Sequence, residues 1–270
     1  MASRVKIMGV VNVTPDSFSD GGRFLAPEAA LHHARRLIAE GADILDIGAE
    51  STRPGAEPAS AEDEIARAVP LIAAIREGSD IPISIDTMKP QVARAAVAAG
   101  ASIWNDVAAL SFSPDAPAVA AELGCDVVLM HMQGEPRTMQ AAPKYDDVVA
   151  EVAAFLQARA QAALAAGVAR DKIWLDPGIG FGKRLEHNLA LLAHLDQITA
   201  LGFPVLLGVS RKRFIAALDP AGGAALDGRL PGSIAAALAG IERGAAAVRV
   251  HDVAETIQAL KVWEAVAAAR

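Results

Sequence analysis

The sequence predicts a single-domain (β/α)8 TIM barrel that spans residues 1–270. The first observation is a pattern that recurs seven times: an alanine-rich, helix-forming segment, then glycine, then a short β-branched run. The second is that each glycine can end a helix, while the run behind it is apolar on both faces, as in parallel sheets covered by helices. The third is a further strand at residues 6–11, which makes eight strands. Eight strands alternating with helices favour a closed barrel, and barrels of this length are commonly one domain.

The seven units follow one another in order along the chain. They are RRLIAEGADILDIG, IAAIREGSDIPISID, ARAAVAAGASIWND, AVAAELGCDVVLMH, AALAAGVARDKIWLD, ITALGFPVLLGVS and GIERGAAAVRVHD. The helix starts agree, because Pro27 and Pro90 stand where a first-turn proline is tolerated, and Ser113 is expected to cap the helix at Pro114. An open, doubly wound sheet is the alternative, but the segment after the first strand lacks the G-x-G-x-x-G turn that such a sheet usually carries.

Composition and charge limit the classes of partner. The chain is 53% hydrophobic and 21% charged, with a formal net charge of -7, which argues against general nucleic-acid binding. The single cysteine, Cys125, cannot form a disulfide within the chain and is expected to be a reduced, buried thiol. We recognise no secretion signal and no apolar run of the roughly 20 residues that a membrane span needs. A cytoplasmic protein without membrane contact is therefore expected.

The loop after the first strand is longer than a connection requires. Residues 12–22 are mostly small, polar or turn-forming and include Asp16 and Asp20. Most strand-to-helix connections in such folds need only a few residues, and long ones are usually functional or disordered. We interpret this loop as a lid over a site for an anionic substrate.

Polar residues follow every predicted strand, at the end of the barrel where such folds place their active sites. In chain order they are Asn12; Glu50, Thr52 and Arg53; Asp86; Asn105 and Asp106; His131; Asp176; the SRKR segment 210–213; and Arg249, His251 and Asp252. Arg249 and His251 alternate with valines, so both side chains are expected on one face of their strand. This cationic pair predicts an anion site, since TIM barrels often bind phosphate near strands seven and eight.

Several of these residues also have a structural interpretation. Asp86 could cap the following helix, Asn105 and Asp106 could both form a turn, and His131 could be a satisfied structural group. An aspartate that ends an apolar strand at a barrel mouth nevertheless favours a site residue for Asp86.

The segments after strands six and seven contain residues expected in the site and residues expected on the surface. Arg211 and Arg213 are expected on a solvated basic face, with Lys212 projecting to the opposite side. Asp176 precedes PGIGFGK, whose glycines permit close approach of a ligand. The GFGK segment, residues 180–183, resembles a phosphate loop only superficially, because it lacks the P-loop spacing.

Together these positions predict a site with two chemical sides. Carboxylates and amides from strands three, four and six face cations from strands two, seven and eight. The first side suits a ring with several N–H donors and acceptors, such as a pterin or purine, and the second suits a phosphate or pyrophosphate. The sequence has no Cys/His metal cluster. Mg²⁺ held by Asn12 and substrate oxygens fits this site, because Mg²⁺ commonly takes few protein ligands and uses phosphate oxygens.

Eight motifs in order resemble the dihydropteroate synthase family. They are GVVNVTPDSFSDGG, DIGAESTRPGAE, ISIDTMKP, NDV, LMHMQGEPRTMQ, LDPGIGFGK, GVSRKRFI and RVHDV, and they extend from residue 7 to about residue 255. A single motif such as NDV is weak, but the ordered set is very specific. The resemblance implies a pterin-binding barrel that condenses 6-hydroxymethyl-7,8-dihydropterin diphosphate with 4-aminobenzoate, giving 7,8-dihydropteroate and diphosphate. It also implies a homodimer, sulfonamide inhibition, and mobile loops after strands one and two.

The resemblance assigns roles to particular residues. It implies that Asn12 ligates Mg²⁺ and that the diphosphate is held by Asn12, Thr52, Arg249 and His251. It implies a pterin site made of Asp86, Asn105, Met130, Asp176, Phe181 and Lys212, and an aminobenzoate site made of Phe18, Arg53, Pro54 and Ser210. The residues expected to carry the catalysis are Asp86, Lys212, Arg249 and His251.

We expect an SN1-like reaction in which diphosphate leaves early, because the pterin ring can delocalise the positive charge on its exocyclic methylene. The cations would stabilise the departing anion, and Asp86 the developing cation. Closure of the loop at residues 14–22 would exclude water.

Two departures and two competing functions complete the sequence analysis. Ile179 stands where phenylalanine or a similar apolar residue is expected, and AALSFSPDAP, residues 108–117, lacks an expected basic residue. A pterin-binding methyltransferase with a corrinoid partner is one competitor, and a non-catalytic paralogue that only binds pterin or diphosphate is the other. The loops TPDSFSDGG and STRPG argue against the first, and the intact Asn12, Arg53, Lys212 and His251 argue against the second.

Overall fold

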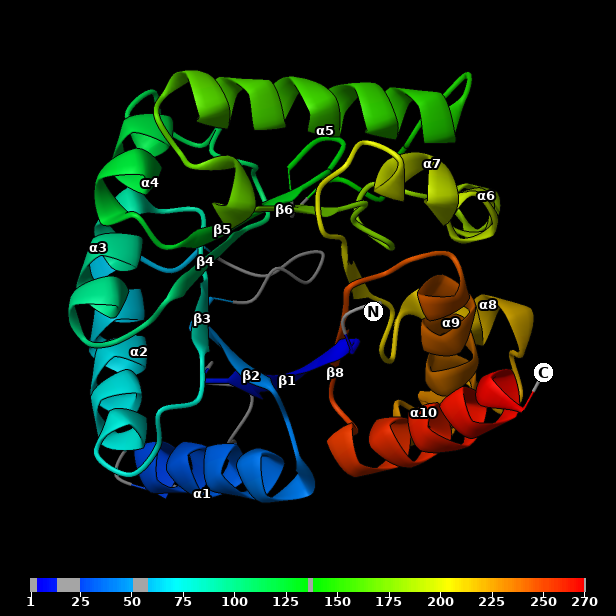
Figure 1. The fold of residues 1–270 in the computed structure, drawn as a ribbon, viewed down its shortest axis with the longest axis horizontal. Helices are drawn as coiled ribbons and strands as arrows, with labels where there is room; N and C mark the ends of the chain where they lie inside the picture. The colour runs from blue at the N-terminus through cyan, green and yellow to red at the C-terminus, as the bar shows by residue number, and fades with distance from the viewer. Residues whose placement is uncertain (1–3, 14–24, 51–57, 136–137, 270) are drawn as a thin grey trace.

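Eight parallel strands form one sheet that closes into a barrel (Figure 1). The computed structural model describes residues 4–13, 25–50, 58–135 and 138–269. The strands are β1 (Lys6–Asn12), β2 (Ile44–Gly48), β3 (Ile83–Asp86), β4 (Ile103–Asp106), β5 (Asp126–Met130), β6 (Ile173–Asp176), β7 (Leu206–Gly208) and β8 (Ala247–Val250). Their order is β6-β5-β4-β3-β2-β1-β8-β7, and a bridge between Leu175 and Val205 joins the two ends. The barrel prediction is confirmed, and the doubly wound alternative is wrong.

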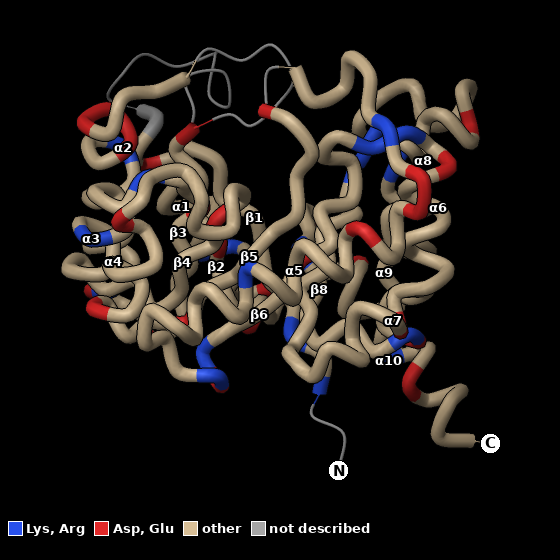
Figure 2. Tube along the Cα trace, turned by 90° about the horizontal axis from the view of Figure 1, so that it is seen from above, with Lys and Arg blue, Asp and Glu red and all other residues tan. Residues whose placement is uncertain are grey.

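Helices surround the barrel on the outside (Figure 1). They are α1 (Leu25–Glu40), α2 (Ala61–Arg76), α3 (Pro90–Ala98), α4 (Ala116–Leu123), α5 (Val148–Ala165), α6 (Leu185–Ala193), α7 (Leu195–Thr199), α8 (Arg213–Leu218), α9 (Leu230–Glu242) and α10 (Val253–Ala268), with short 3₁₀ turns η2 (Arg170–Lys172) and η3 (Asp227–Arg229). The last turns of α10 project from the barrel when it is seen from the side (Figure 2), and their side chains are exposed.

Alternation along each strand divides the side chains between two cores. Ile47, Ile85 and Trp104 belong to the large core between the strands and the surrounding helices. Inside the barrel, near the N-terminal ends of the strands, a smaller apolar cluster fills the space; it consists of Met8, Ile44, Ile103, Val128, Leu206 and Ala247. We call this cluster the barrel floor. Residues two and four positions further along the same strands point inward above it, since successive side chains alternate between the faces of a sheet.

The predicted helix starts hold at one position and fail at another. Pro90 is in the first turn of α3, as predicted. Ser113 does not cap a helix at Pro114, because α4 begins at Ala116 after Asp115. The Ser113 hydroxyl instead donates to Oδ1 of Asp115 at 2.6 Å, so it stabilises the turn that precedes the helix.

Two expectations about burial have different outcomes. Cys125 is buried and forms no disulfide, as predicted. Among the described residues, α5 is long and apolar enough to cross a membrane by length and composition alone, which the sequence analysis did not anticipate. In the fold this helix packs against β5 and β6 through a buried face that includes Val152, Leu156 and Ala160.

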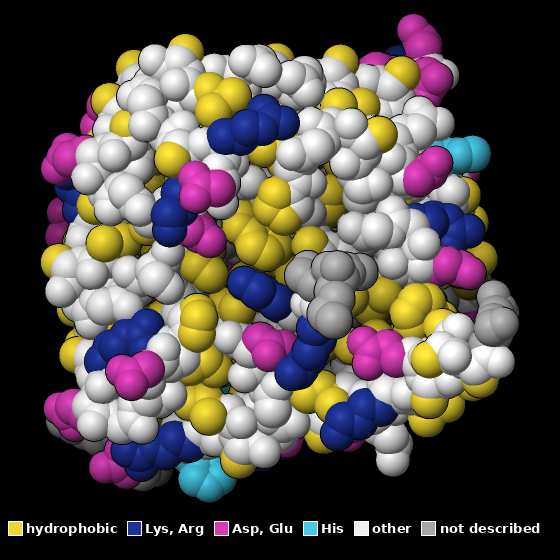
Figure 3. Space-filling view, in the orientation of Figure 1, with side chains coloured by type: hydrophobic (Ala, Val, Ile, Leu, Met, Phe, Trp, Pro, Cys, Tyr) yellow, Lys and Arg dark blue, Asp and Glu magenta, His cyan; other side chains and the backbone are white. Residues whose placement is uncertain are grey.

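The face of the molecule shown in Figure 3 carries charges of both signs. Basic and acidic side chains are interspersed with apolar ones there, and the coloured part of this face has no broad region of one sign.

Candidate active site

Every predicted site residue within the described ranges lines one cavity at the C-terminal mouth of the barrel. These residues are Asn12, Asp86, Asn105, Met130, Asp176, Phe181, Ser210, Lys212, Arg249 and His251. The cavity has a volume of about 670 Å³. Its lining comes from seven strand ends and the loops behind them, so residues far apart in the sequence meet because the parallel strands all end at the same mouth.

A guanidinium between two carboxylates crosses the centre of the mouth. Nε of Arg249 donates to Oδ2 of Asp46 at 2.6 Å, and one of its terminal nitrogens donates to Oδ2 of Asp86 at 3.0 Å. Burial raises the pKa of Asp86 to about 7, the negative charge of Asp46 adds to this shift, and Arg249 opposes it. Burial works against the charged form of Arg249, but Asp46 and Asp86 outweigh it and raise its pKa. Arg249 therefore stays charged and aimed into the cavity.

The opposite wall combines a buried lysine with an aromatic ring. Nζ of Lys212 lies 4.0 Å from the ring centroid of Phe181, which is a cation–π geometry. Burial lowers the pKa of Lys212 to about 8, while the charge of Asp176 opposes the shift. Oδ1 of Asp176 accepts a hydrogen bond from the backbone N–H of Gly178 at 2.7 Å, which fixes its orientation. Burial raises the pKa of Asp176.

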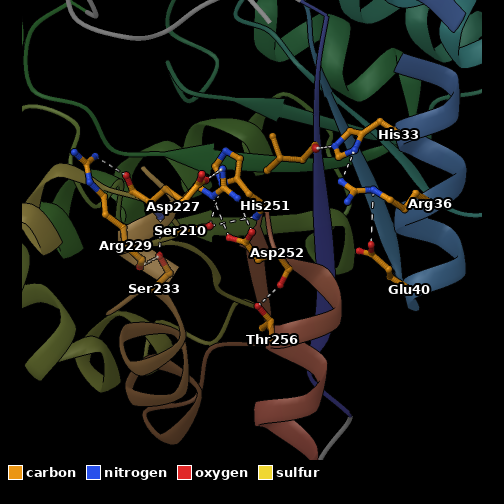
Figure 4. A network of polar contacts seen from close by, with 12 residues as sticks. His33, Arg36, Glu40, Ser210, Asp227, Arg229, Ser233, His251, Asp252 and Thr256 are labelled. Carbon is orange, nitrogen blue, oxygen red and sulfur yellow. Dashed lines mark hydrogen bonds and ion pairs between the residues drawn. The ribbon is translucent and has the colours of Figure 1, made fainter. Parts of the chain in front are cut away.

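Ser210 and His251 join the ends of β7 and β8. The Ser210 hydroxyl lies 3.0 Å from Nδ1 of His251 and accepts a hydrogen bond from the backbone N–H of the same residue at 3.2 Å (Figure 4). Burial lowers the pKa of His251 to about 3, and the charge of Arg249 lowers it further. His251 is therefore a neutral imidazole in this structure, rather than the cation assumed in the sequence analysis. It can bind an oxygen by donating from Nε2 while Nδ1 is held by Ser210.

The neighbouring residues Asn105 and Asp106 point to opposite sides of β4. Nδ2 of Asn105 faces the interior and lies 3.4 Å from Oδ1 of Asp46. Asp106 is fully buried outside the cavity, where its carboxylate accepts from the backbone N–H groups of Ala108 and Leu110 at 2.7 and 2.8 Å. Asp106 thus forms a turn, as one interpretation held, whereas Asn105 lines the cavity and its role in binding stays a prediction.

Arg211 differs from its predicted role, and Lys183, for which no role was predicted, lines the cavity. Arg211 does not lie on a solvated basic face, because its guanidinium forms two hydrogen bonds to the carboxylate of Asp252. Lys183, in the GFGK segment, is buried and lines the cavity, and its Nζ donates to Nδ1 of His131 at 2.9 Å. His131 is a satisfied structural group, as its alternative interpretation proposed. Burial lowers the pKa of Lys183 to about 7.

The sequence analysis missed Asp46, which contacts both Arg249 and Asn105. Asp46 has no exposed surface and lies on β2 at an inward position, two residues after the floor residue Ile44. A charged residue at an inward position within a predicted strand was the available signal. Asp46 lies within its strand and not at its end, so the pattern of polar strand ends does not include it.

Four predicted residues and one predicted segment lie outside the described residues. They are Phe18, Thr52, Arg53, Pro54 and the loop at residues 14–22. Their assignments stay predictions.

The residues at the mouth fit a magnesium ion that is bound mainly through substrate. Among the described residues, no three His, Cys, Asp or Glu side chains are grouped as metal ligands. Asn12 offers an amide oxygen to the cavity, as one of the hard oxygen ligands that Mg²⁺ accepts. This donor set suits an ion that borrows most of its ligands from phosphate oxygens and water.

Comparison with known proteins agrees with this geometry. Residues 8–251 match the model of the family described as pterin binding enzyme. The chain belongs to the pterin-binding enzymes. A curated relative from this family, dihydropteroate synthase of Neisseria meningitidis serogroup B, is 53% identical over 265 residues, which are 96% of this chain and 92% of the relative.

Solved structures of pterin-binding enzymes superpose closely on the barrel. Dihydropteroate synthase from Xanthomonas albilineans with 4-aminobenzoic acid has a TM-score of 0.93 at 51% identity, covering 99% of this chain and 94% of that one. The same enzyme in complex with 7,8-dihydropteroate has a TM-score of 0.89 at 48% identity, covering 99% and 95%. Both the fold and the family predicted from the ordered motifs are therefore confirmed.

Proposed function

We propose that this pterin-binding barrel condenses 6-hydroxymethyl-7,8-dihydropterin diphosphate with 4-aminobenzoate, releasing diphosphate and forming 7,8-dihydropteroate. The protein is accordingly a transferase of folate biosynthesis, the dihydropteroate synthase reaction. The observation that supports this most strongly is that carboxylates, amides and cations from different strand ends line one cavity. Relatives named for this reaction match nearly the whole chain.

The carboxylates and amides of the cavity bind the pterin in this proposal. Asp86, Asn105 and Asp176 present acceptors and donors to the ring edge, and Met130 and Phe181 supply apolar surface for its faces. Because a carboxylate accepts from ring N–H groups, Asp176, fixed by Gly178, is suited to the pyrimidine edge of the ring. Lys212 would lie against the ring system, beside Phe181, whose ring centroid is 4.0 Å from its Nζ.

Arg249 and His251 bind the diphosphate in this proposal. Arg249 projects from β8 and keeps its charge, and His251 donates one neutral N–H from the same strand face. Asn12 would hold Mg²⁺ together with diphosphate oxygens, and Thr52 would contact the same group. The ion, when bound, neutralises charge that develops on the leaving diphosphate.

In this proposal diphosphate departs early, because the pterin ring can delocalise the positive charge that develops on the exocyclic methylene. The bond from the exocyclic methylene to oxygen breaks first, its electron pair leaves with the diphosphate, and the pterin ring carries the positive charge. Asp86 stabilises that charge, and the amine of 4-aminobenzoate then attacks the methylene and loses a proton. Phe18, Arg53, Pro54 and Ser210 would position the aminobenzoate.

A direct test is product formation from labelled 4-aminobenzoate and the dihydropterin diphosphate, with and without Mg²⁺. Product that requires Mg²⁺ and is lost in Asp86→Ala supports the proposal. Measurable pterin binding without product contradicts it and favours the binding paralogue, whereas dependence on a methyl donor would indicate the methyltransferase. Exchange of labelled diphosphate into substrate in the absence of 4-aminobenzoate tests early departure.

We also propose that the protein is a cytoplasmic homodimer. An apolar groove of about 440 Å³ between α6, α8 and α9 offers a face for a second copy, and Leu218 at its edge is 56% exposed. Leu218→Asp should convert dimer to monomer in sedimentation, whereas Val262→Asp on α10, equally exposed at 62%, should not. A monomeric wild-type protein would contradict the proposal.

A further inference from the structure

Arg211 has a backbone conformation that its residue type disfavours. Its φ is +57°, and among the described residues only Ala109 and Leu110 share a positive φ without being glycine. L-residues with a Cβ rarely occupy this region, and such residues persist where the surrounding structure holds them. Arg211 lies in the short link between β7 and α8, where the chain turns at the edge of the cavity.

Hydrogen bonds fix both the backbone and the side chain of Arg211. Its guanidinium donates to the carboxylate of Asp252 through Nε at 3.1 Å and through a terminal nitrogen at 2.5 Å. Its backbone N–H donates to the hydroxyl of Ser233 at 2.9 Å, and its carbonyl accepts from the guanidinium of Arg229 at 3.0 Å. Ser233 in turn donates to the carbonyl of Arg229 at 2.7 Å, so the contacts form one network (Figure 4).

The left-handed turn places the two neighbours of Arg211 on the substrate side. Ser210 reaches His251, and Lys212 lies over Phe181, and all of them line the cavity. Asp252, the partner of Arg211, is the residue directly after His251. Each member of the ion pair is therefore next in sequence to a proposed substrate ligand, and the pair ties the end of β7 to the end of β8.

The positive charge of Arg211 is paired with carboxylates of the protein itself. A bidentate arginine–carboxylate pair fixes both partners in orientation, and the Asp252 side chain is only 13% exposed. Asp227 adds a second carboxylate at 3.6 Å from the Arg211 guanidinium. The Arg211 guanidinium therefore links the end of β7 to the end of β8 through Asp252.

We propose that Arg211 and Asp252 are a positioning pair, which holds the left-handed turn and thereby sets where Ser210, Lys212 and His251 meet the substrates. This inference rests on the proposed function and extends it to two residues that do not themselves touch the reacting atoms. Ser233 and Arg229 support the pair from α9 and the turn before it.

The test is a double-mutant cycle on equilibrium binding of the dihydropterin diphosphate, measured by calorimetry with Mg²⁺ present. Arg211→Gln and Asp252→Asn should each weaken binding by about 10-fold, and the double variant should be no weaker than either, because interacting residues give non-additive effects. In a protein that already carries Lys212→Ala, Arg211→Gln should weaken binding by much less than 10-fold. The reason is that part of the effect of Arg211 on binding acts through Lys212. The KM for 4-aminobenzoate should rise as well, through Ser210.

The matched control is Arg94→Gln, which breaks another bidentate pair, to Glu122, far from the cavity between α3 and α4. It should change neither binding nor KM. Additive effects of Arg211→Gln and Asp252→Asn, or unchanged binding in a folded Asp252→Asn protein, would overturn the proposal. Asp252→Asn keeps the shape of the side chain, so it serves if Arg211→Gln does not fold. A wild-type protein that binds the pterin diphosphate but forms no product would contradict the proposed function. The double-mutant cycle could still be measured in that case, because it depends on binding and not on turnover.

Discussion

The two ends of the barrel interior are built from the same strands but contain opposite chemistry. At the floor, inward positions carry apolar residues such as Ile44, Ile103 and Leu206. Two to four residues further along, the same faces carry Asp46, Asn105 and other polar groups. The floor contributes stability through burial of apolar surface, whereas the mouth buries charges that are costly without partners.

The difference shows how the mouth stays folded. The buried Arg249 has carboxylate partners on two other strands, Asp46 and Asp86. Removing one partner therefore leaves the other charge buried alone, while a floor residue can be shortened without affecting any charge. Substitutions at the mouth should change chemistry first, and substitutions at the floor should change stability first.

The largest effect is expected at Asp86. Asp86→Asn should lower kcat by about 10²- to 10³-fold, because it removes the charge that faces the developing cation. Steady-state kinetics with saturating substrates measures this. Equal activity of the variant and the wild type would contradict the difference between mouth and floor, since Asp86 at the mouth would then have no chemical role.

The floor should give the complementary result. Leu206 has no exposed surface. Leu206→Ala should lower the free energy of unfolding by about 2–5 kcal/mol through the lost burial and the cavity left behind. Urea denaturation measures this, and Val262→Ala on the exposed side of α10 is the control. Below the melting temperature kcat and KM should stay at wild-type values, and a strong loss of turnover in the folded variant would contradict the separation.

Asn105 and Asp106 allow the comparison within two consecutive residues. Asp106→Ala should cost about 1–3 kcal/mol of unfolding free energy, because two buried backbone N–H groups lose their acceptor. Asn105→Ala should weaken pterin binding with a smaller loss of stability. Urea denaturation and binding calorimetry on both variants test these two expectations. A larger loss of stability in Asn105→Ala and a larger loss of pterin binding in Asp106→Ala would contradict the assigned directions of the side chains.

The smallest effect is expected in the pH dependence of stability. Burial lowers the pKa of His131 to about 3, so the unfolded chain, with a histidine pKa near 6.5, takes up a proton that the folded chain does not. The His131 contribution is therefore complete above pH 6.5 and decreases as the pH falls, by about 1.4 kcal/mol between pH 8 and pH 5.5.

Urea denaturation of wild type and His131→Asn at these two pH values isolates this contribution. The asparagine can still accept a hydrogen bond from Lys183 but does not titrate. The free energy of unfolding should therefore fall by about 1.4 kcal/mol less in the variant than in the wild type between pH 8 and pH 5.5. His251, whose pKa is also lowered to about 3, contributes to the decrease in both proteins. Identical decreases would show that His131 does not stay neutral.

Most of the fold and much of the site could be predicted from local pattern. The glycine-terminated helices and short apolar strands specify alternation, and eight repeats specify closure. Polar residues at strand ends then fall at one mouth, which is why Asp86, Asp176 and Lys212 were found. The start of α4 was misplaced at Ser113, because a serine before proline is a frequent cap and nothing local shows that its hydroxyl is used by Asp115.

The sequence by itself determined the order of the elements, the parallel sheet, the family and the strand-end residues, since each depends on periodicity or on motifs of neighbouring residues. Only the tertiary structure decided which charges are paired. Asp46 and Arg249 are 203 positions apart, and Arg211 and Asp252 are 41 apart. Contacts over such separations exist only after the strands have paired, because pairing brings β8 beside β1 and β7. For the same reason, burial in the closed mouth, and not the residue type, makes His251 neutral and holds Arg211 within the fold instead of on its surface.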